Sequence, residues 1–317
     1  MLIILIGSCF LLLFLNMYYK HVMLRNTQEY HISRVTKDTW DALSFGSSYC
    51  RFGLDFSETA MKGYNLGFAG QFFYYTDKML RQYAHFVKRG GHIFIICADL
   101  CFAEVGKGWF NAHQYIKFLN KEYLGDEYSS WKYVSRVMFP VVFHPRLILS
   151  ILKDITYRII GKPIYNVYSI DYNPMSELEV SLDAKRRCEG WCNQFGLKNT
   201  QTNDISETLE KKFDQTTKIL ENMIDFCLSQ GLSPVLVCTP LSHHLNNLLS
   251  DEFLERVLYS NIRKANSANI PFLDYTRDNR FQDSRFYIDA DKLNAMGRKE
   301  FTKVLVDDIT KIEKTLK

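Results

Sequence analysis

The feature that most constrains the fold is an alternation of short apolar runs with longer amphipathic segments. The apolar runs lie at residues 39–45, just before Asn65, and at 92–97, 234–238 and 271–275. Apolar residues recur at helical spacing at 72–88, between 207 and 231, at 251–267 and at 294–315. Short apolar runs bounded by turn residues are typical of buried parallel strands. Their alternation with helices predicts an α/β fold, a doubly wound parallel sheet of five strands.

Local signals predict where two of these helices begin or end. Gly90-Gly91 follows the stripe at 72–88 and predicts that the helix stops there. Asp204-Ile-Ser-Glu207 has the form of a capping box, and it predicts the start of the helix that ends at Gly231.

The middle of the chain does not follow this alternation of apolar runs and amphipathic segments. Residues 101–203 are rich in Trp, Tyr and Phe, and we interpret them as an insertion within a domain that spans 39–317. Inside the insertion, residues 144–160 are basic and amphipathic. This pattern fits a helix packed on the core, and it also fits a helix lying on a membrane surface.

The N-terminus has the composition of a membrane segment. Residues 1–19 carry no charged side chain, and about 17 apolar residues is the lower limit for a spanning helix. A basic leading region and a small-residue cleavage site, which mark a signal peptide, are not evident. We therefore predict an uncleaved N-terminal transmembrane helix at 1–19 and a polar linker at 20–38. Lys20 and Arg25 follow the helix, so the positive-inside rule alone favours a cytoplasmic main domain.

Charge and cysteine content exclude some classes of function. The net charge of +4 is small and dispersed, whereas a nucleic-acid-binding protein needs a clustered basic face. The eight cysteines form no CxxC pair and no Cys/His spacing typical of zinc. We therefore predict no metal and no cofactor. Cys188 and Cys192 are one helical turn apart and could form a disulfide if their geometry allows it.

Polar side chains follow the predicted strands. Gly46-Ser47-Ser48 follows the first strand, and Tyr64-Asn65-Leu66-Gly67 follows the second. Asp99 and Thr239 follow the third and fourth strands, and the loop at 286–297 leads into the last helix. The carboxyl ends of parallel strands meet at one edge of the sheet, where ligands bind in open α/β folds. We expect these segments to converge there.

These segments resemble those of the SGNH/GDSL hydrolase superfamily. The pattern Gly-Ser-Ser-x-x-x-x-Gly-Leu-Asp at 46–55 matches the first block, and Asn-Leu-Gly-Phe-Ala-Gly-Gln at 65–71 matches the second. The pattern Asp-x-Asp-x-Leu-Asn-x-x-Gly at 289–297 matches the last block. Within the superfamily the chain is similar to a membrane-anchored group that includes alginate O-acetylation proteins and the D-alanyl transfer proteins of lipoteichoic acid. The resemblance covers about 45–100 and 205–315.

The resemblance implies a role for each matching residue. Ser48 would be the nucleophile, and its own backbone N–H would help to hold the oxyanion. Gly67 would supply a second oxyanion N–H, and Asp289 would orient the base three residues later. The further residues assigned to oxyanion or substrate binding are Asn65, Asp99 and Thr239.

One position departs from the pattern of the family. The family has a histidine where this chain has Lys292. An ordinary lysine has a pKa of about 10.4 and is charged at neutral pH, and Asp289 and Asp291 beside it would favour the charged form further. Two bases stay open: Lys292 with a pKa lowered by burial, or a histidine from the pair His243-His244 after the fourth strand.

The resemblance implies a membrane-anchored acyl esterase or O-acyltransferase. Its substrate would be an acylated glycan or acyl donor of a cell-surface polysaccharide, and its partner a membrane-bound acyltransferase. The main domain would then lie outside the cytoplasm. An alternative is an inactive protein of the same fold that binds glycan or scaffolds a biosynthetic complex. A third interpretation, which follows the positive-inside orientation, is a cytoplasmic-side protein whose Gly-Ser-Ser turn binds an anion.

Overall fold

The computed structural model describes residues 2–37, 39–104, 112–162, 175–202 and 204–315. It divides into two compact units. The first comprises Met1–Thr36 and Phe110–Ile170, and the second comprises Lys37–Trp109 and Asp171–Lys317. Residue 38 of the predicted linker, and residues 105–111, 163–174 and 203 of the predicted insertion, lie outside the described residues.

The second unit contains a five-stranded, entirely parallel sheet, which confirms the predicted fold class. Its strands are β1 (Trp40–Phe45), β2 (Gly63–Asn65), β3 (Val87–Cys97), β4 (Ser233–Cys238) and β5 (Phe272–Asp274). The order across the sheet is β2-β1-β3-β4-β5. The strand order therefore reverses between β1 and β3, and such a switch point is where open α/β sheets bind ligands.

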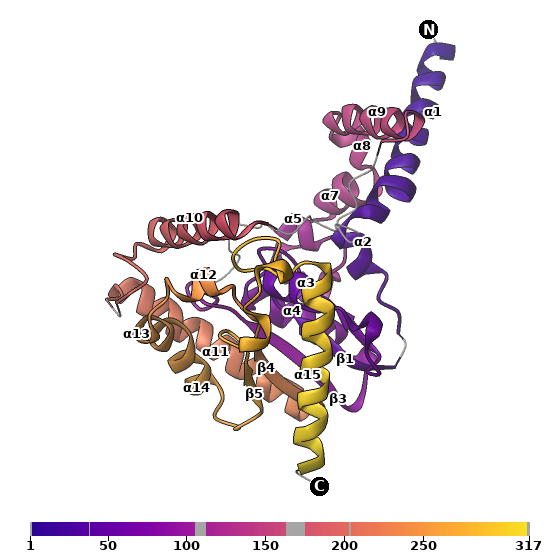
Figure 1. The fold of residues 1–317 in the computed structure, drawn as a ribbon. Helices are drawn as coiled ribbons and strands as arrows, with labels where there is room; N and C mark the ends of the chain where they lie inside the picture. The colour runs from indigo at the N-terminus through magenta and orange to yellow at the C-terminus, as the bar shows by residue number, and fades with distance from the viewer. Residues whose placement is uncertain (1, 38, 105–111, 163–174, 203, 316–317) are drawn as a thin grey trace. The chain divides into compact units, whose positions relative to one another are not determined.

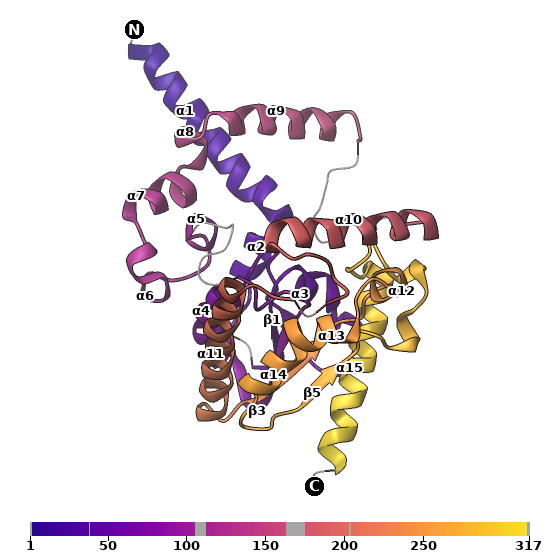
Figure 2. The same cartoon turned by 90° about the vertical axis from the view of Figure 1, so that its left-hand side faces the viewer.

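Helices cover both faces of this sheet (Figures 1 and 2). On one face α4 (Phe73–Tyr83) packs beside α11 (Glu207–Ser229), and α14 (Ser260–Ala265) packs beside α11 in turn. On the other face α3 (Ser48–Gly53) and α15 (Ala295–Thr315) pack together. Phe94 and Ile96 of β3 join Phe301 and Leu305 of α15 in one buried cluster. The core thus holds α3, and with it Ser48, against the sheet.

Gly90-Gly91 does not end a helix, so that prediction is wrong. Helix α4 ends at Tyr83, a 3₁₀ turn covers Ala84–Phe86, and both glycines lie inside β3. The pairing of β1 with β3 shifts register at this point. Gly90 has a φ of +75°, and a Cβ on Gly91 would lie 2.7 Å from the carbonyl oxygen of Asp41. The glycines therefore accommodate a bulge between two close backbones.

The predicted capping box at 204–207 is also wrong. The N-cap of α11 is Ser206, whose Oγ accepts a hydrogen bond of 3.3 Å from the N–H of Leu209. Asp204 lies outside the helix in an ion pair with Lys198. The predicted end of α11 is confirmed, because Gly231 follows it with a φ of +67°.

The first unit is helical, including most of the segment predicted to be a linker. Helix α1 (Leu2–Tyr18) continues through a π turn (Tyr19–Met23) and a 3₁₀ turn (Leu24–Asn26) to α2 (Gln28–Ser33). Thr27 caps α2, and Ile32 is fully buried, so these residues belong to a packed unit. The other helices of the unit are α5 (Ala112–Tyr115), α6 (Lys121–Leu124), α7 (Ser130–Tyr133), α8 (Pro140–Phe143) and α9 (Arg146–Ile159).

Helices α1 and α9 pack together through a small contact. Leu15 of α1 and Ile151 of α9 form a buried cluster with Val141. Tyr18 donates a hydrogen bond of 2.7 Å to Asp154 of α9. Within the described ranges, no helix combines the length and the apolar character needed to cross a membrane. The structure therefore gives no support to the predicted transmembrane helix at 1–19.

Candidate active site

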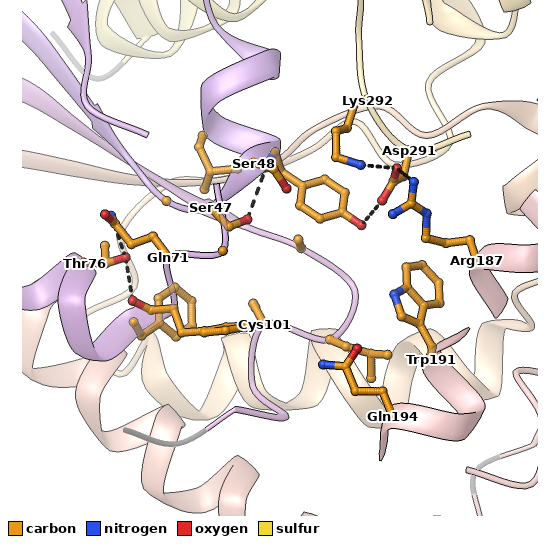
Figure 3. Close-up of a pocket in the computed structure, with 18 of the residues that line it drawn as sticks. Ser47, Ser48, Gln71, Thr76, Cys101, Arg187, Trp191, Gln194, Asp291 and Lys292 are labelled. Atoms are coloured by element: carbon orange, nitrogen blue, oxygen red, sulfur yellow. Dashed lines mark hydrogen bonds and ion pairs between the residues drawn. The ribbon is translucent and has the colours of Figure 1, made fainter. Parts of the chain in front are cut away.

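A pocket of about 220 Å³ lies at the carboxyl edge of the sheet, in the second unit (Figure 3). Its wall is built from the segments that follow β1, β2 and β3, from the loop before α15, and from one face of α10 (Glu177–Phe195). Ser48 and Lys292, which are 244 positions apart in the chain, both line this pocket. The predicted convergence of distant loops at the sheet edge is therefore observed for these two residues.

The turn after β1 places Ser48 on the pocket wall. Gly46 has a φ of +150°, and a Cβ there would meet Ile96 at 3.0 Å, so only glycine fits the turn. Ser47 then caps α3 by accepting a hydrogen bond of 3.5 Å from the N–H of Tyr49. Ser48 is the first residue of α3. The first N–H groups of a helix have no partner within it, so the N–H of Ser48 is not engaged inside α3.

Lys292 is bound by carboxylates. Its Nζ donates to Asp289 Oδ2 at 3.0 Å and to Asp291 Oδ1 at 2.7 Å. The guanidinium of Arg187 lies 3.3 Å from the same Asp289 oxygen and 2.8 Å from Asp291 Oδ1. Figure 3 shows Arg187 and Lys292 beside Asp291. The hydroxyl of Tyr49 donates to the other oxygen of Asp291 at 2.6 Å. Two cations thus balance two aspartates beside the pocket.

This pairing holds the proton on Lys292. Burial acts to lower the pKa of Lys292, but the charges of Asp291 and Asp289 outweigh it and raise that pKa above its ordinary value. Burial acts to raise the pKa of Asp291, and here Lys292 and Arg187 outweigh it and hold that pKa below its usual range. The predicted general base with a lowered pKa is therefore not the state of Lys292 in this structure.

Two other carboxyl groups titrate near neutral pH. Burial, followed by the charge of Asp291, raises the pKa of Asp289 to about 7. The same two causes raise the pKa of Asp99 to about 7. Asp99 is 2% exposed, and its Oδ2 lies 3.3 Å from the hydroxyl oxygen of Tyr49, whose single hydrogen is donated to Asp291. The hydroxyl of Tyr49 therefore lies between Asp99 and Asp291, although Asp99 itself is not on the pocket wall.

Asn65 and Gly67 support α3 instead of facing the pocket. The amide Nδ2 of Asn65 donates to the carbonyls of Cys50 and Leu54, each at 2.8 Å, and so holds the end of α3. Its Oδ1 accepts the N–H of Gly67 at 2.8 Å. The oxyanion role predicted for Gly67 is unsupported, because that N–H is already engaged. Thr239 is 5% exposed and is likewise not part of the lining.

Several residues of the pocket were missed by the sequence analysis. Gly70, with a φ of +72°, and Gln71 line it just beyond Gly67. Gln71 is 2% exposed, and its Oε1 has no hydrogen-bond partner within the described part of the chain. The phrase at 65–71 contains both residues, so a signal for them was present. Arg187 and Trp191 come from α10, where no motif distinguishes them from other residues of the insertion.

The histidine pair is not a substitute base for Ser48. His243 and His244 are not part of the pocket lining, and their ring nitrogens contact Gln282 and Glu177. The disulfide considered for Cys188 and Cys192 is not formed, since both are free thiols. No protein-family model matches this sequence, and no curated protein matches it. The function must therefore be argued from the geometry of the pocket.

Proposed function

We propose that this chain is an SGNH-like protein that binds an acyl ester of a cell-surface polysaccharide at Ser48 and transfers or hydrolyses the acyl group slowly. The observation that carries the proposal is the placement of Ser48 and Lys292 on one small pocket at the carboxyl edge of the sheet. The slow rate follows from the ion pairs of Lys292, because a charged ammonium cannot accept the serine proton.

The size and lining of the pocket favour a small acyl group. Ligand sites usually enclose about 300–1,000 Å³, whereas this one encloses about 220 Å³. An acetyl group fits within that volume, and the attached sugar would remain at the mouth. Trp191 offers a flat apolar face for the sugar.

The reaction would use Ser48 as the nucleophile. Its Oγ attacks the ester carbonyl carbon while solvent hydroxide takes its proton to form water. The bond between the carbonyl carbon and the sugar oxygen then breaks, and the sugar oxygen takes a proton from water. The acyl group stays on Ser48 until a water molecule or an acceptor hydroxyl attacks it and restores the free serine. The N–H groups of Ser48 and Gly70 are the donors proposed for the oxyanion. The ammonium of Lys292 adds positive charge beside the developing oxyanion, which is the role we assign to it.

A fluorophosphonate probe tests the nucleophile. The full chain in detergent is incubated with the probe, and the site of added mass is mapped. We expect slow labelling of Ser48 that rises in proportion to hydroxide concentration. Ser48→Ala should abolish the labelling, whereas Ser47→Ala, which removes the neighbouring hydroxyl of the same pocket, should keep it. Labelling that survives Ser48→Ala would refute the assignment.

A second candidate function is glycan binding without chemistry. The observation that favours it is the double ion pair of Lys292, which leaves Ser48 without a base. This candidate predicts retained binding of acetylated polysaccharide together with no labelling of Ser48 at any pH. The probe experiment therefore separates the two functions.

We also propose that the first unit attaches the protein to a membrane surface, with the α/β unit on the extracytoplasmic side and a membrane-bound acyltransferase as partner. The support is that the first unit exposes large apolar side chains and that one of its helices also exposes positively charged side chains. Phe10 is 69% exposed and Leu149 is 71% exposed, and α9 also carries the exposed cations Arg146 and Lys153. Amphipathic helices of this composition bind anionic lipid surfaces.

Co-sedimentation of the full chain with anionic vesicles tests this attachment. The double variant Phe10→Ser with Leu149→Ser should sediment less than the wild type, because it removes exposed apolar side chains of the first unit. Leu228→Ser, which alters a residue of the second unit that is 43% exposed, is the control. Equal sedimentation of all three proteins would contradict the attachment. Protease accessibility in intact cells tests the orientation.

A further inference from the structure

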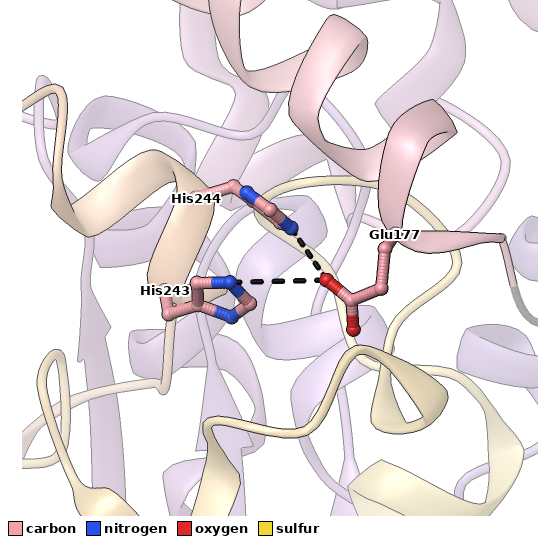
Figure 4. A group of neighbouring side chains, drawn as sticks. All are labelled: Glu177, His243 and His244. Atoms are coloured by element: carbon pink, nitrogen blue, oxygen red, sulfur yellow. Dashed lines mark hydrogen bonds and ion pairs between the residues drawn. The ribbon is translucent and has the colours of Figure 1, made fainter.

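A second cluster of chemically competent side chains lies outside the pocket. Glu177 is the first residue of α10, and His243 and His244 belong to α12 (His243–Asn246), which follows β4. One ligand atom from each of the three lies within 4.8 Å of the other two. Figure 4 shows both imidazole rings turned toward the carboxylate of Glu177. From this arrangement we infer that Glu177, His243 and His244 bind a zinc ion.

The distances fit a shared ion. Zinc–ligand bonds to histidine nitrogen and carboxylate oxygen are about 2.0–2.2 Å long, so two ligands of a tetrahedral ion stand roughly 3.4 Å apart. The Oε2 atom of Glu177 lies 2.6 Å from Nε2 of His244 and 3.8 Å from Nε2 of His243. These separations bracket the required one, and Glu177 can adjust because its side chain is 64% exposed.

The surroundings prepare His243 as a ligand. Its Nδ1 lies 3.0 Å from the backbone carbonyl oxygen of Gln282. A carbonyl can only accept, so Nδ1 carries a hydrogen, and Nε2 is the ring nitrogen that lies toward Glu177. Metal-binding histidines are commonly oriented by such a hydrogen bond from the other ring nitrogen. Three protein ligands, two imidazoles and one carboxylate, suit zinc and leave its fourth position to water.

The cluster includes the first residue of α10, the helix that also contributes residues to the pocket, so a bound ion would affect the pocket. Zinc would join the first residue of α10 to α12 and so hold the start of α10 against the rest of the α/β unit. The same helix carries Arg187, which pairs with Asp289 and Asp291, and Trp191, which lines the pocket. Zinc binding would therefore fix the wall of the candidate active site without touching the reacting atoms. This inference concerns binding and holds whether or not Ser48 performs chemistry.

Equilibrium dialysis of the full chain against zinc chloride, with thiols kept reduced, tests the site. We expect one bound zinc per chain that depends on the cluster. His244→Ala and Glu177→Gln should each lower the affinity by at least about 100-fold, since loss of outer-shell partners alone costs about 10–100-fold. His85→Ala and Glu189→Gln, which change exposed residues outside the cluster, should leave it unaltered.

Two further readouts make the result decisive. Cobalt substituted for zinc should give the absorption of a nitrogen–oxygen site without a thiolate band, and a thiolate band would assign the metal to cysteine instead. Zinc should also slow tryptic cleavage of α10 at its exposed Lys185 and Arg186 in the wild type and not in His244→Ala. If Glu177→Gln bound zinc as tightly as the wild type, the inference would be overturned. This variant is expected to fold normally because Glu177 is on the surface.

Discussion

Replacing Lys292 with methionine should destabilise the fold strongly. The Lys292 side chain is 13% exposed and pairs with two carboxylates, one of which, on Asp291, is 2% exposed. Removing one partner of a buried ion pair costs about 3–5 kcal/mol. Arg187 remains 2.8 Å from Asp291 and continues to neutralise it. We therefore expect a loss at the lower end of that range, about 3 kcal/mol.

Urea unfolding followed by circular dichroism measures this loss. The midpoint should fall while the slope stays unchanged, because the surface exposed on unfolding is the same. Lys299→Met is the matched control, since Lys299 pairs with Glu58 at a more exposed position. Solvent-exposed pairs of this kind contribute little to stability. A loss no larger for Lys292→Met than for Lys299→Met would refute the conclusion that Lys292 is a buried charge balancing two aspartates.

The pH dependence of this difference has a definite sign. The folded-state pKa of Lys292 is raised, so its contribution is complete below the ordinary lysine pKa of about 10.4 and is lost as the pH rises through the folded value. The folded-state pKa of Asp291 is lowered, so its contribution is present above about pH 3.9 and is lost as the pH falls further. Lys292 also lowers the pKa of Asp289, which is about 7 in the wild type, so that pKa is higher in Lys292→Met and the stability difference between the two proteins should grow as the pH rises above about 7.

Three further predictions concern stability. The pKa of Asp99 is about 7 in the folded state, so Asp99 makes the free energy of unfolding of the wild type fall as the pH rises from about 4 to 7. In Asp99→Asn this fall should be smaller by up to about 1.4 kcal/mol per pH unit, as measured by urea unfolding at a series of pH values. Gly67→Ala should cost about 1–3 kcal/mol, because its Cβ would lie 2.5 Å from the backbone of α3, whereas Gly190→Ala, in open space on α10, should stabilise by about 0.5–1 kcal/mol in thermal melts. Ser206→Ala should cost about 1 kcal/mol as the loss of an N-cap, and Asp204→Ala should cost less.

The centre of the sheet was predictable because β3 and β4 are buried along most of their length. Continuous apolar runs such as 92–97 and 234–238 are typical of strands without a solvent-exposed face, and both runs lie within strands that pair in parallel. The prediction that a helix ends at Gly90-Gly91 was wrong because a contact between strands determines the structure there. The two glycines permit a close approach to β1. In the sequence, a glycine pair with this role looks the same as a glycine pair that ends a helix.

The pocket was predictable only where its residues follow strands. Ser48 and Lys292 follow β1 and β5 along the chain, so the topology of a parallel sheet brings them to one edge. Arg187 and Trp191 reach the same pocket from α10, whose place in the fold depends on packing that no motif records. Asn65 was assigned to the substrate because its type and position suited that role. The structure shows instead that its amide holds the end of α3.

The proposed chemistry depends on the proton that Lys292 retains, and Lys292→His tests this most directly. Asp289 would then face an imidazole, which accepts a proton near pH 7. Hydrolysis of 4-nitrophenyl acetate by the full chain should rise by about 100-fold or more, the usual contribution of a general base, with a midpoint near the ordinary histidine pKa of about 6.5. Adding Ser48→Ala should remove the gain. A rate that stays near zero in Lys292→His, or a gain that survives Ser48→Ala, would contradict a serine acyl-ester site.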